Sequence, residues 1–389
     1  MKEFITIKNF GPLRNIENLE IKQFTFLIGE SASGKSTLMK VICMMRYIYK
    51  MANIRSYLRH SKITKSPFRM VLPSMMKETG LGKMLKPNSS IIFRVEIREG
   101  TAYELRIENK TLRQLPIIAK EDLVFNKVSF ISENRNIIPN WTENASHNAE
   151  ARIGFYFKET NTDFARASEY DKVVDLNYLG MKLEIVHPKG KPTRYLIIPN
   201  DDRHDPIELR DASSGIQTSV PLTVIVKNFA ESESNYGFSF KEAFRRSIIE
   251  CLYQMDRLTK FEPTKEQSEL PKNVFVHIEE PELSLFPDAQ CQLIEELIYT
   301  ATHADADRTV NLMLATHSPY ILNYMNIVLN QTKEGRARLA PENLAVYRLY
   351  EGKVQNLVAK DDKGRNIVDS FDLSEMMSTI YNEFIHLGV

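Results

Sequence analysis

Residues Gly29 to Ser36 read Gly-Glu-Ser-Ala-Ser-Gly-Lys-Ser, which satisfies the phosphate-binding loop pattern G-x-x-x-x-G-K-[ST] at every fixed position. The apolar run 24–28 before it is typical of a strand, and residues 37–42 after it are typical of a helix. In this setting, backbone N–H groups and the helix N-terminus surround a phosphate. A chance match in a Gly/Ser turn is the alternative, and the flanking strand and helix weigh against it. The pattern therefore predicts an α/β fold of the P-loop nucleotide-binding type.

Each position of the loop has a predicted role. The side chain of Lys35 would reach the β- and γ-phosphates, and the Ser36 hydroxyl would bind Mg²⁺. We expect ATP to contact the segment as a whole, which comprises Gly29, Glu30, Ser31, Ala32, Ser33, Gly34, Lys35, Ser36 and Thr37.

The amino-acid composition excludes few classes of function. Lys and Arg total 51 against 50 Asp and Glu, and this balance neither demands nor excludes nucleic acid, because a basic face can exist within a neutral total. No apolar run approaches the ~18 residues of a membrane span, and no signal-peptide core follows the N-terminus. The three cysteines are far apart, show no metal-ligand spacing and fit a reducing compartment. We expect a cytoplasmic protein without a membrane partner.

A second apolar strand, 274–278, ends in Glu279-Glu280-Pro281-Glu282. Two adjacent carboxylates suit ATP hydrolysis, because holding the metal and accepting a proton from water are separate tasks. By position, Glu279 is assigned to the metal and Glu280 to the general base. Such a pair is usually a solvated turn, but the Pro281 that follows favours the catalytic interpretation.

Two further turns are candidates. The apolar strand 312–315 ends in Thr316-His317, and a histidine there could contact the γ-phosphate and orient the water, although lone histidines are mostly surface or core residues. Ser213-Ser214-Gly215 opens an apolar helix at 218–226 and could be a second anion site or an ordinary helix cap. Nothing in the serine turn alone decides between these readings.

Together and in this order, the motifs resemble the ABC-type ATPase heads of the RecF, SMC and OLD family group. The resemblance is carried by residues 9–13, 29–36, 213–217, 279–287 and 316–319, and more weakly by 132–135. It implies a head with a mixed or antiparallel β subdomain and a helical subdomain, working as a homodimer or larger homo-oligomer. It also implies that Ser213, Ser214 and Gly215 act on the γ-phosphate held by the partner chain, while His317 acts as the switch histidine.

Three features depart from the pattern of these heads. Ser31-Ala32 stands where Asn-Gly is usual, and Ile216 occupies a position that is usually polar. No glutamine loop can be placed, and Gln114 and Glu133 remain unassigned candidates.

We expect one head made of three lobes. The first, 1–139, holds the phosphate loop and β-hairpins; the second, 140–270, is an inserted helical lobe with the turn at 213–217; the third, 271–389, holds the carboxylates, His317 and a terminal hairpin and helix.

The segments around the motifs distinguish between the branches of this family group. No heptad run suggests the arms of SMC proteins, and the stretch after His317 is too short for the Toprim nuclease of OLD proteins. What remains is similar to the stand-alone PtuA-type ATPases of bacterial anti-phage systems, which implies gating of a separately encoded nuclease or toxin. The alternative is a RecF/SMC-like DNA-binding ATPase of DNA repair or maintenance. Its DNA contact would be the basic stretch 55–69, which is equally readable as a solvated helix face and contains Arg55, Arg59, Lys62, Lys65 and Arg69.

Overall fold

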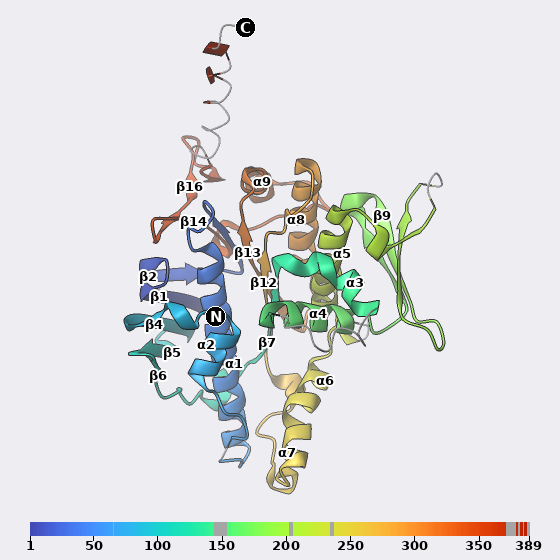
Figure 1. The fold of residues 1–389 in the computed structure, drawn as a ribbon. Coiled ribbons are helices and arrows are strands. Elements are labelled where there is room, and N and C mark those ends of the chain that lie inside the picture. Colours follow the sequence, from blue (N-terminus) through green and yellow to red (C-terminus); the bar gives the residue numbers. More distant parts are fainter. Residues whose placement is uncertain are drawn as a thin grey trace.

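The computed structural model describes residues 1–64, 66–143, 154–201, 205–233 and 237–370, with 379, 382, 383, 385 and 386 (Figure 1). Of the expected terminal helix, which the sequence places over about 373–387, only residues 379, 382, 383, 385 and 386 are described, and these are helical. Within them, no helix has the length and apolar content to cross a membrane.

A six-stranded sheet forms the centre of the molecule, in the order β15-β14-β3-β13-β12-β7. Five of the strands are parallel, and β15 joins antiparallel at one edge. The strands are β3 (Phe24–Ile28), β7 (Phe125–Ile131), β12 (Lys272–Glu279), β13 (Arg308–Thr316), β14 (Leu344–Tyr350) and β15 (Lys353–Asn356). Every residue of β3 is buried, as a parallel strand covered on both faces requires.

The register of this sheet brings the predicted motifs to one edge. Thr316 lies opposite Ile28, Ala315 opposite Glu279, and Ile278 opposite Ile131. The carboxyl ends of β3, β13, β12 and β7 therefore lie side by side, and the polar segments that follow them meet there.

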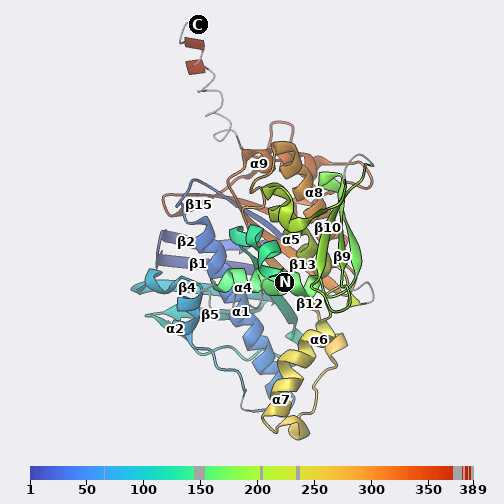
Figure 2. The same cartoon turned by 45° about the vertical axis from the view of Figure 1, so that its right-hand side comes forward.

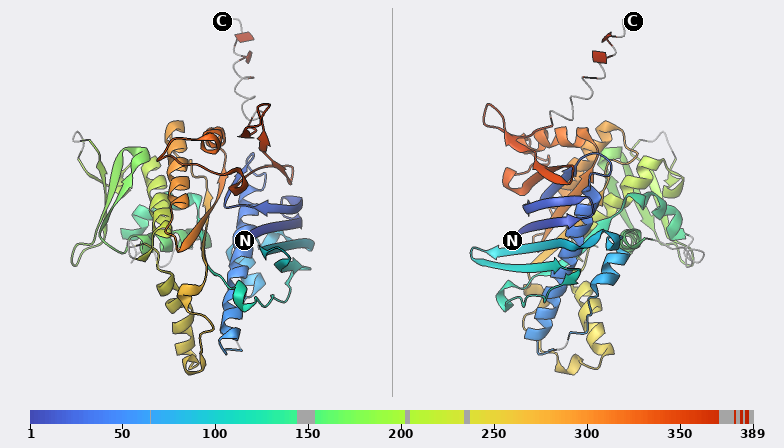
Figure 3. Two further views of the ribbon diagram at one scale, coloured as in Figure 1. Left: turned by 180° about the vertical axis from the view of Figure 1, so that it is seen from behind. Right: turned by 60° about the vertical axis from the view of Figure 1, so that its left-hand side comes forward.

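Helix α1 (Lys35–His60) lies between the central sheet and a second, antiparallel sheet (Figures 1 and 3). It contacts β7, β12 and β13 on one side and β5 on the other. This double packing explains why α1 is buried on nearly all sides. The second sheet has the order β2-β1-β4-β5-β6, with β1 (Lys2–Phe10), β2 (Leu13–Ile21), β4 (Leu85–Arg98), β5 (Thr101–Glu108) and β6 (Thr111–Leu112).

Helices α5 (Ser214–Ala230) and α8 (Pro287–Thr302) pack on β13, and α9 (Pro319–Asn330) packs on α8. Helix α4 (Phe155–Ala167) contacts both β7 and α5, and the short helices α2 (Leu72–Glu78) and α3 (Ile138–Glu143) complete the layers. A third sheet lies outside α5, with β8 (Lys172–Leu176), β9 (Met181–Val186), β10 (Arg194–Pro199) and β11 (Ile207–Glu208). The expected hairpins and apolar strands are present. The segment 140–270, which was expected to be an inserted helical lobe, contains this sheet as well as helices.

Two further segments lie at the periphery of these layers. Helix α6 (Phe240–Phe244) continues through one π-helical turn, Arg245–Ile249, into α7 (Glu250–Gln254), and this arm projects beside the end of α1 (Figure 2). After β15, β16 (Val358–Lys360) pairs with β17 (Asn366–Val368).

A buried polar network links the two sheets through α1. Arg46 donates to Glu3 Oε2 on β1 from Nε at 3.0 Å and Nη2 at 2.6 Å, and to His277 Nε2 on β12 from Nη1 at 3.0 Å. The Nδ1–H of His277 then donates to the carbonyl oxygen of Ser129 on β7 at 2.8 Å. Because its Nε2 accepts from a guanidinium, the imidazole is neutral. Burial and the Arg46 charge lower the pKa of His277 to about 3.

This neutral histidine predicts a specific loss of stability in acid. Its folded pKa lies below the value of 6.5 in the unfolded chain, so the unfolded state binds the extra proton between pH 6.5 and 3. The contribution of His277 to the free energy of unfolding is therefore fully present above pH 6.5. It falls by about 1.4 kcal/mol for each unit by which the pH is lowered from 6.5 towards 3. His277→Gln lacks the proton uptake. The gap in free energy of unfolding between wild type and variant, measured by urea at several pH values, should shrink as pH falls. A constant gap would contradict a neutral His277.

Candidate nucleotide-binding site

The phosphate loop connects β3 to α1, and two glycines and one alanine in it adopt positive φ angles. Gly29 and Gly34 have φ of 154° and 105°, and a Cβ on Gly29 would lie 2.4 Å from the carbonyl oxygen of Leu349. Ala32 has φ of 63°, a conformation that costs a non-glycine residue about 1–2 kcal/mol. The departure from Asn-Gly at Ser31-Ala32 therefore leaves the left-handed turn in place, at some cost in free energy.

Lys35, the cation of the loop, is buried, with 5% of its surface exposed. Its Nζ donates to the carbonyl oxygens of Gly29 at 2.7 Å and Glu30 at 2.8 Å. Burial lowers its pKa, and the charges of Glu280 and Glu282 oppose this. The ammonium is thus held by neutral acceptors at the mouth of the loop, where a phosphate oxygen would be a stronger acceptor. Ser36, one residue further on, is exposed.

The first carboxylate after β12, Glu279, lies in a crowded polar cluster. Its Oε1 is 3.2 Å from the Nζ of Lys40 on α1, and its Oε2 is buried with no hydrogen-bond donor among the described residues. Burial, followed by the adjacent carboxyl of Glu133, raises the pKa of Glu279 to about 8. A buried carboxylate oxygen without a donor, beside a second carboxyl, is the environment in which a divalent cation would be stabilised. Together with the exposed Ser36 hydroxyl, these residues fit a Mg²⁺ site.

The second carboxylate, Glu280, faces His317. The Nε2 of His317 lies 3.8 Å from Glu280 Oε1, and the two side chains are 39% and 40% exposed. The backbone N–H of His317 donates to Glu282 Oε1 at 2.6 Å, which attaches the end of β13 to the turn after β12. The pair is therefore open to solvent and flanked by the buried metal-side cluster, an arrangement suited to positioning and deprotonating a water molecule.

Arg135 holds the edge of the sheet together. Its side chain is fully buried, and its donors reach four carbonyl oxygens: Thr218 at 2.8 Å, Ser132 at 3.0 Å, Glu279 at 2.7 Å and Glu280 at 2.6 Å. Burial lowers its pKa to about 10, and the surrounding carboxylates oppose this. One guanidinium thus connects the end of β7, helix α5 and the backbone of both carboxylates.

Residues 213–215 begin α5 and pack on the turn that follows the carboxylates. Ser213 is the N-cap residue, yet its side chain makes no capping hydrogen bond, and both Ser213 and Ser214 are exposed. Gly215 lies so close to this turn that a Cβ would be 2.7 Å from the carbonyl oxygen of Ser284. The Thr218 hydroxyl donates to the Leu283 carbonyl at 2.9 Å. The two serines are thus presented outward from a fixed helix N-terminus, which ordinary side-chain capping does not explain.

Sequence reasoning did not assign Arg135, Glu133, Lys40 or Glu282 to the site. Glu133 and Arg135 lie in the segment 132–135, whose similarity to ATPase heads was the weakest, and Lys40 follows Ser36 by one helical turn. Gln114, the other candidate for the glutamine loop, is exposed beyond β6 at the edge of the second sheet.

The basic stretch 55–69 lies at the other end of α1 from the phosphate loop. Arg55, Arg59 and Arg69 are exposed, and Lys62 forms an ion pair with Glu262 at 2.5 Å. Lys65 lies outside the described residues. A DNA contact through the basic stretch 55–69 stays a prediction.

Comparisons with known proteins give one family match over part of the chain and weak similarities to solved structures. Residues 205–322 match the family model for an AAA ATPase domain, a span that contains Ser213–Gly215, Glu279, Glu280 and His317 but not the phosphate loop. No curated protein matches the chain. Among solved structures, an SMC head domain from Thermotoga maritima has a TM-score of 0.37 at 12% identity, covering 92% of this chain and 98% of its own. The recombination mediator protein RecF has a TM-score of 0.34 at 12% identity, covering 91% and 97%.

The central parallel sheet, the phosphate loop and the helix that follows it make this a P-loop ATPase fold, as the sequence predicted. The assignments of individual site residues remain predictions, and the geometry brings Lys35, Glu279, Glu280 and His317 to one edge of one sheet.

The contact between Gly215 and the turn at Ser284 can be tested without nucleotide. Gly215→Ala places a methyl group against a backbone carbonyl that is itself held in a positive-φ turn, so the chain must shift. We expect a loss of roughly 1–3 kcal/mol in the free energy of unfolding. Ser214→Ala, at the exposed neighbouring position, is the control and should change stability little. Equal urea midpoints for both variants would show that α5 does not pack closely on this turn.

Proposed function

We propose that the chain binds and hydrolyses ATP with Mg²⁺ at the carboxyl edge of its central sheet. The observation that supports this most strongly is the Glu280–His317 pair, 3.8 Å apart and partly exposed, at the ends of β12 and β13, the two strands that follow β3 on one side of the sheet. A nucleotide-binding protein without hydrolysis needs the loop but has no use for this pair.

In this proposal each residue has one task. Backbone N–H groups of 29–34 and the ammonium of Lys35 bind the phosphates, and Ser36 and Glu279 hold Mg²⁺, which neutralises phosphate charge when bound. Glu280 accepts a proton from the attacking water, and His317 orients that water against the γ-phosphate. Arg135 fixes the backbone from which Glu280 projects, through its 2.6 Å bond to the Glu280 carbonyl.

We further propose that the chain acts as a single head, with lobes 1–139, 140–270 and 271–389, and that two heads share each nucleotide. Ser213, Ser214 and Gly215 begin a 17-residue helix whose N-terminal serine caps nothing with its side chain. An outward-facing helix N-terminus favours an anion. The γ-phosphate held by a second copy supplies one, and closure on it would couple ATP binding to dimerisation.

Gating of a partner effector, a nuclease or toxin in bacterial anti-phage defence, is the biological role that we propose. In the described part of the chain, no group of three or more His, Cys, Asp or Glu side chains could hold a metal ion for nuclease chemistry. The described residues between Lys35 and Ser213 form sheets and short helices after α1, which differs from an SMC-type arm. The same ATPase centre also fits a DNA-maintenance ATPase, and the two roles differ in the partner that the ATP-bound dimer engages.

Replacement of the general base tests the catalytic assignment. Glu280→Gln should reduce ATP turnover by about 100-fold or more, because it removes the proton acceptor and keeps the shape of the side chain. ATP binding, followed with a fluorescent analogue, should stay close to wild type, and the variant should accumulate as an ATP-bound dimer in light scattering. Glu342→Gln, exposed and far along the chain, is the control. Undiminished turnover in Glu280→Gln would refute the assignment.

A mixing experiment tests whether two chains share a site. Lys35→Ala should abolish phosphate binding by its own loop, and Ser213→Glu should place a negative charge against the partner's γ-phosphate, so each variant alone should be inactive. In a mixture, one site of each heterodimer combines the intact Lys35 of one chain with the intact Ser213 of the other. Part of the ATPase activity should therefore return. Activity that stays absent, when co-purification of two differently tagged variants shows mixed dimers, would contradict the shared site.

A further inference from the structure

Helix α1 carries a cation, Lys40, one turn beyond the Ser36 hydroxyl that we assign to Mg²⁺. Residues four positions apart on a helix lie on the same face, so the two side chains are neighbours. The Nζ of Lys40 lies 3.2 Å from Glu279 Oε1, and the Lys40 side chain is 25% exposed. An ammonium group of the chain therefore contacts the carboxylate that we assign to the metal.

Among the described residues, Lys40 is the only cationic side chain that forms an ion pair with this carboxylate. Lys35 donates to carbonyl oxygens of the phosphate loop, and Arg135 donates to the backbone carbonyl of Glu279. The second oxygen of the carboxylate, Oε2, is buried and has no hydrogen-bond donor among the described residues. Lys40 and a metal ion at this position would therefore share one carboxylate.

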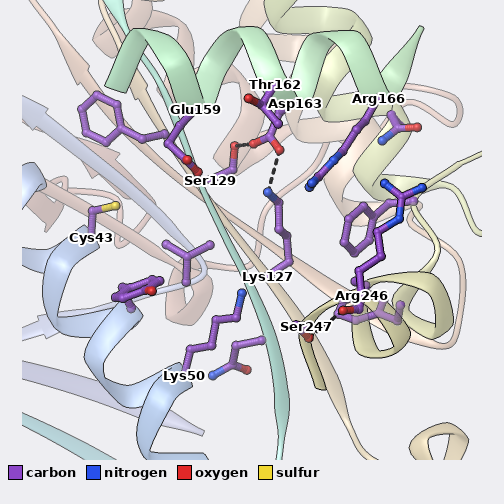
Figure 4. Close-up of a pocket in the computed structure, with 18 of the residues that line it drawn as sticks. Cys43, Lys50, Lys127, Ser129, Glu159, Thr162, Asp163, Arg166, Arg246 and Ser247 are labelled. Atoms are coloured by element: carbon purple, nitrogen blue, oxygen red, sulfur yellow. Dashed lines mark hydrogen bonds and ion pairs between the residues drawn. The ribbon is translucent and has the colours of Figure 1, made fainter. Parts of the chain in front are cut away.

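Two aromatic rings offer Lys40 a second partner. Its Nζ lies 5.8 Å from the ring centroid of Phe130 on β7 and 5.3 Å from that of Tyr156 on α4. These distances are within the ~6 Å at which the face of an aromatic ring attracts a cation. Both rings also line a cavity of about 1050 Å³ between α1, β7 and α4 (Figure 4). The ammonium can thus leave Glu279 Oε1 and keep an attractive partner.

Lys40 and a divalent cation would oppose each other at Glu279. Like charges repel, and the repulsion is strong where burial limits hydration. Phosphate groups that bind together with the metal cancel part of its charge and reduce this repulsion. The charge of Lys40 therefore lowers the affinity for a bare metal ion more than the affinity for a metal that arrives with nucleotide.

We propose that Lys40 competes with the metal for Glu279 and so makes metal binding at this site depend on bound nucleotide. When metal and nucleotide bind together, the ammonium moves away from Oε1 and stays over the rings of Phe130 and Tyr156. This role of Lys40 rests on the proposed function, because that proposal assigns Glu279 to Mg²⁺. Lys40 would regulate the site without binding the phosphates or accepting the proton.

Binding of Mn²⁺ to the full chain without nucleotide tests this competition, because electron paramagnetic resonance measures free Mn²⁺ directly and needs no turnover. Lys40→Met removes the charge and keeps the length of the side chain, so it should bind Mn²⁺ about fivefold tighter than wild type, or more. Lys40→Arg keeps the charge and is the matched control, with an affinity close to wild type. Loss of a positive charge favours a proton on Glu279 as well, but it favours a dication more, since Coulomb energy is proportional to charge.

Two further arms locate the effect. ADP should tighten Mn²⁺ binding by a larger factor in wild type than in Lys40→Met. Combining Glu279→Gln with Lys40→Met should remove the gain, because the carboxylate for which the cations compete is then absent. Lys40→Gln is a second neutral variant, to be used where Lys40→Met does not fold.

Neutral variants at position 40 that are folded by circular dichroism and bind Mn²⁺ no tighter than wild type would overturn the competition. A gain that persists in the double variant would overturn it too. ATP turnover separates this result from failure of the proposed function. Turnover in wild type without a gain in Mn²⁺ affinity contradicts only the role of Lys40, whereas a gain without turnover contradicts hydrolysis and supports the competition.

Discussion

The site depends first on one buried cation. Arg135 has no solvent to hydrate its charge, and four backbone carbonyls from three segments replace that solvent. Leaving a buried polar group without its partner costs about 1–3 kcal/mol, so each of these carbonyls depends on the guanidinium as much as it depends on them. The consequence is structural: the ends of β7 and β12 and the start of α5 cannot move independently. The position of Glu280, the proposed base, and that of the 213–215 turn rely on this coupling, because each adjoins one of the three segments.

The sequence predicted those parts of the site that a short segment determines by itself. The phosphate loop requires only its own glycines and the helix that follows, and apolar runs ending in Glu279-Glu280 or Thr316-His317 imply one shared edge once the strands are parallel. Arg135 could not be predicted in this way, because its partners Thr218 and Glu280 lie 83 and 145 residues away along the chain. The same holds for Lys40 beside Glu279. A charge in an apolar segment is ambiguous until the neighbouring element is known.

The segment 140–210 shows another limit. Strands β8, β9 and β10 alternate buried and more exposed residues, as a sheet covered on one face does. Helix α4 gave no clear signal although it contributes Thr160 and Asp163 to β7, since both are polar residues buried by partners remote in sequence. Lys127 can be buried because it forms an ion pair with Asp163, and His277 can be buried because it is hydrogen-bonded to Arg46. In each case the two partners are buried together.

The hydrogen bonds that make the site rigid also hold its residues in strained backbone conformations. Glu280 and Ser284, like Ala32, hold positive φ values of 45°, 61° and 63° without being glycine, and such conformations persist only where the surroundings impose them. For Glu280 the surroundings are specific: its N–H donates to the Ala315 carbonyl at 2.8 Å, and its carbonyl accepts from Arg135 and from the N–H of Leu283. Three hydrogen bonds thus fix the main chain of one residue whose side chain is 40% exposed. The fixed backbone holds the attachment point of the Glu280 carboxylate in place, and such pre-organisation is what the proposed proton acceptor would require beside a phosphate.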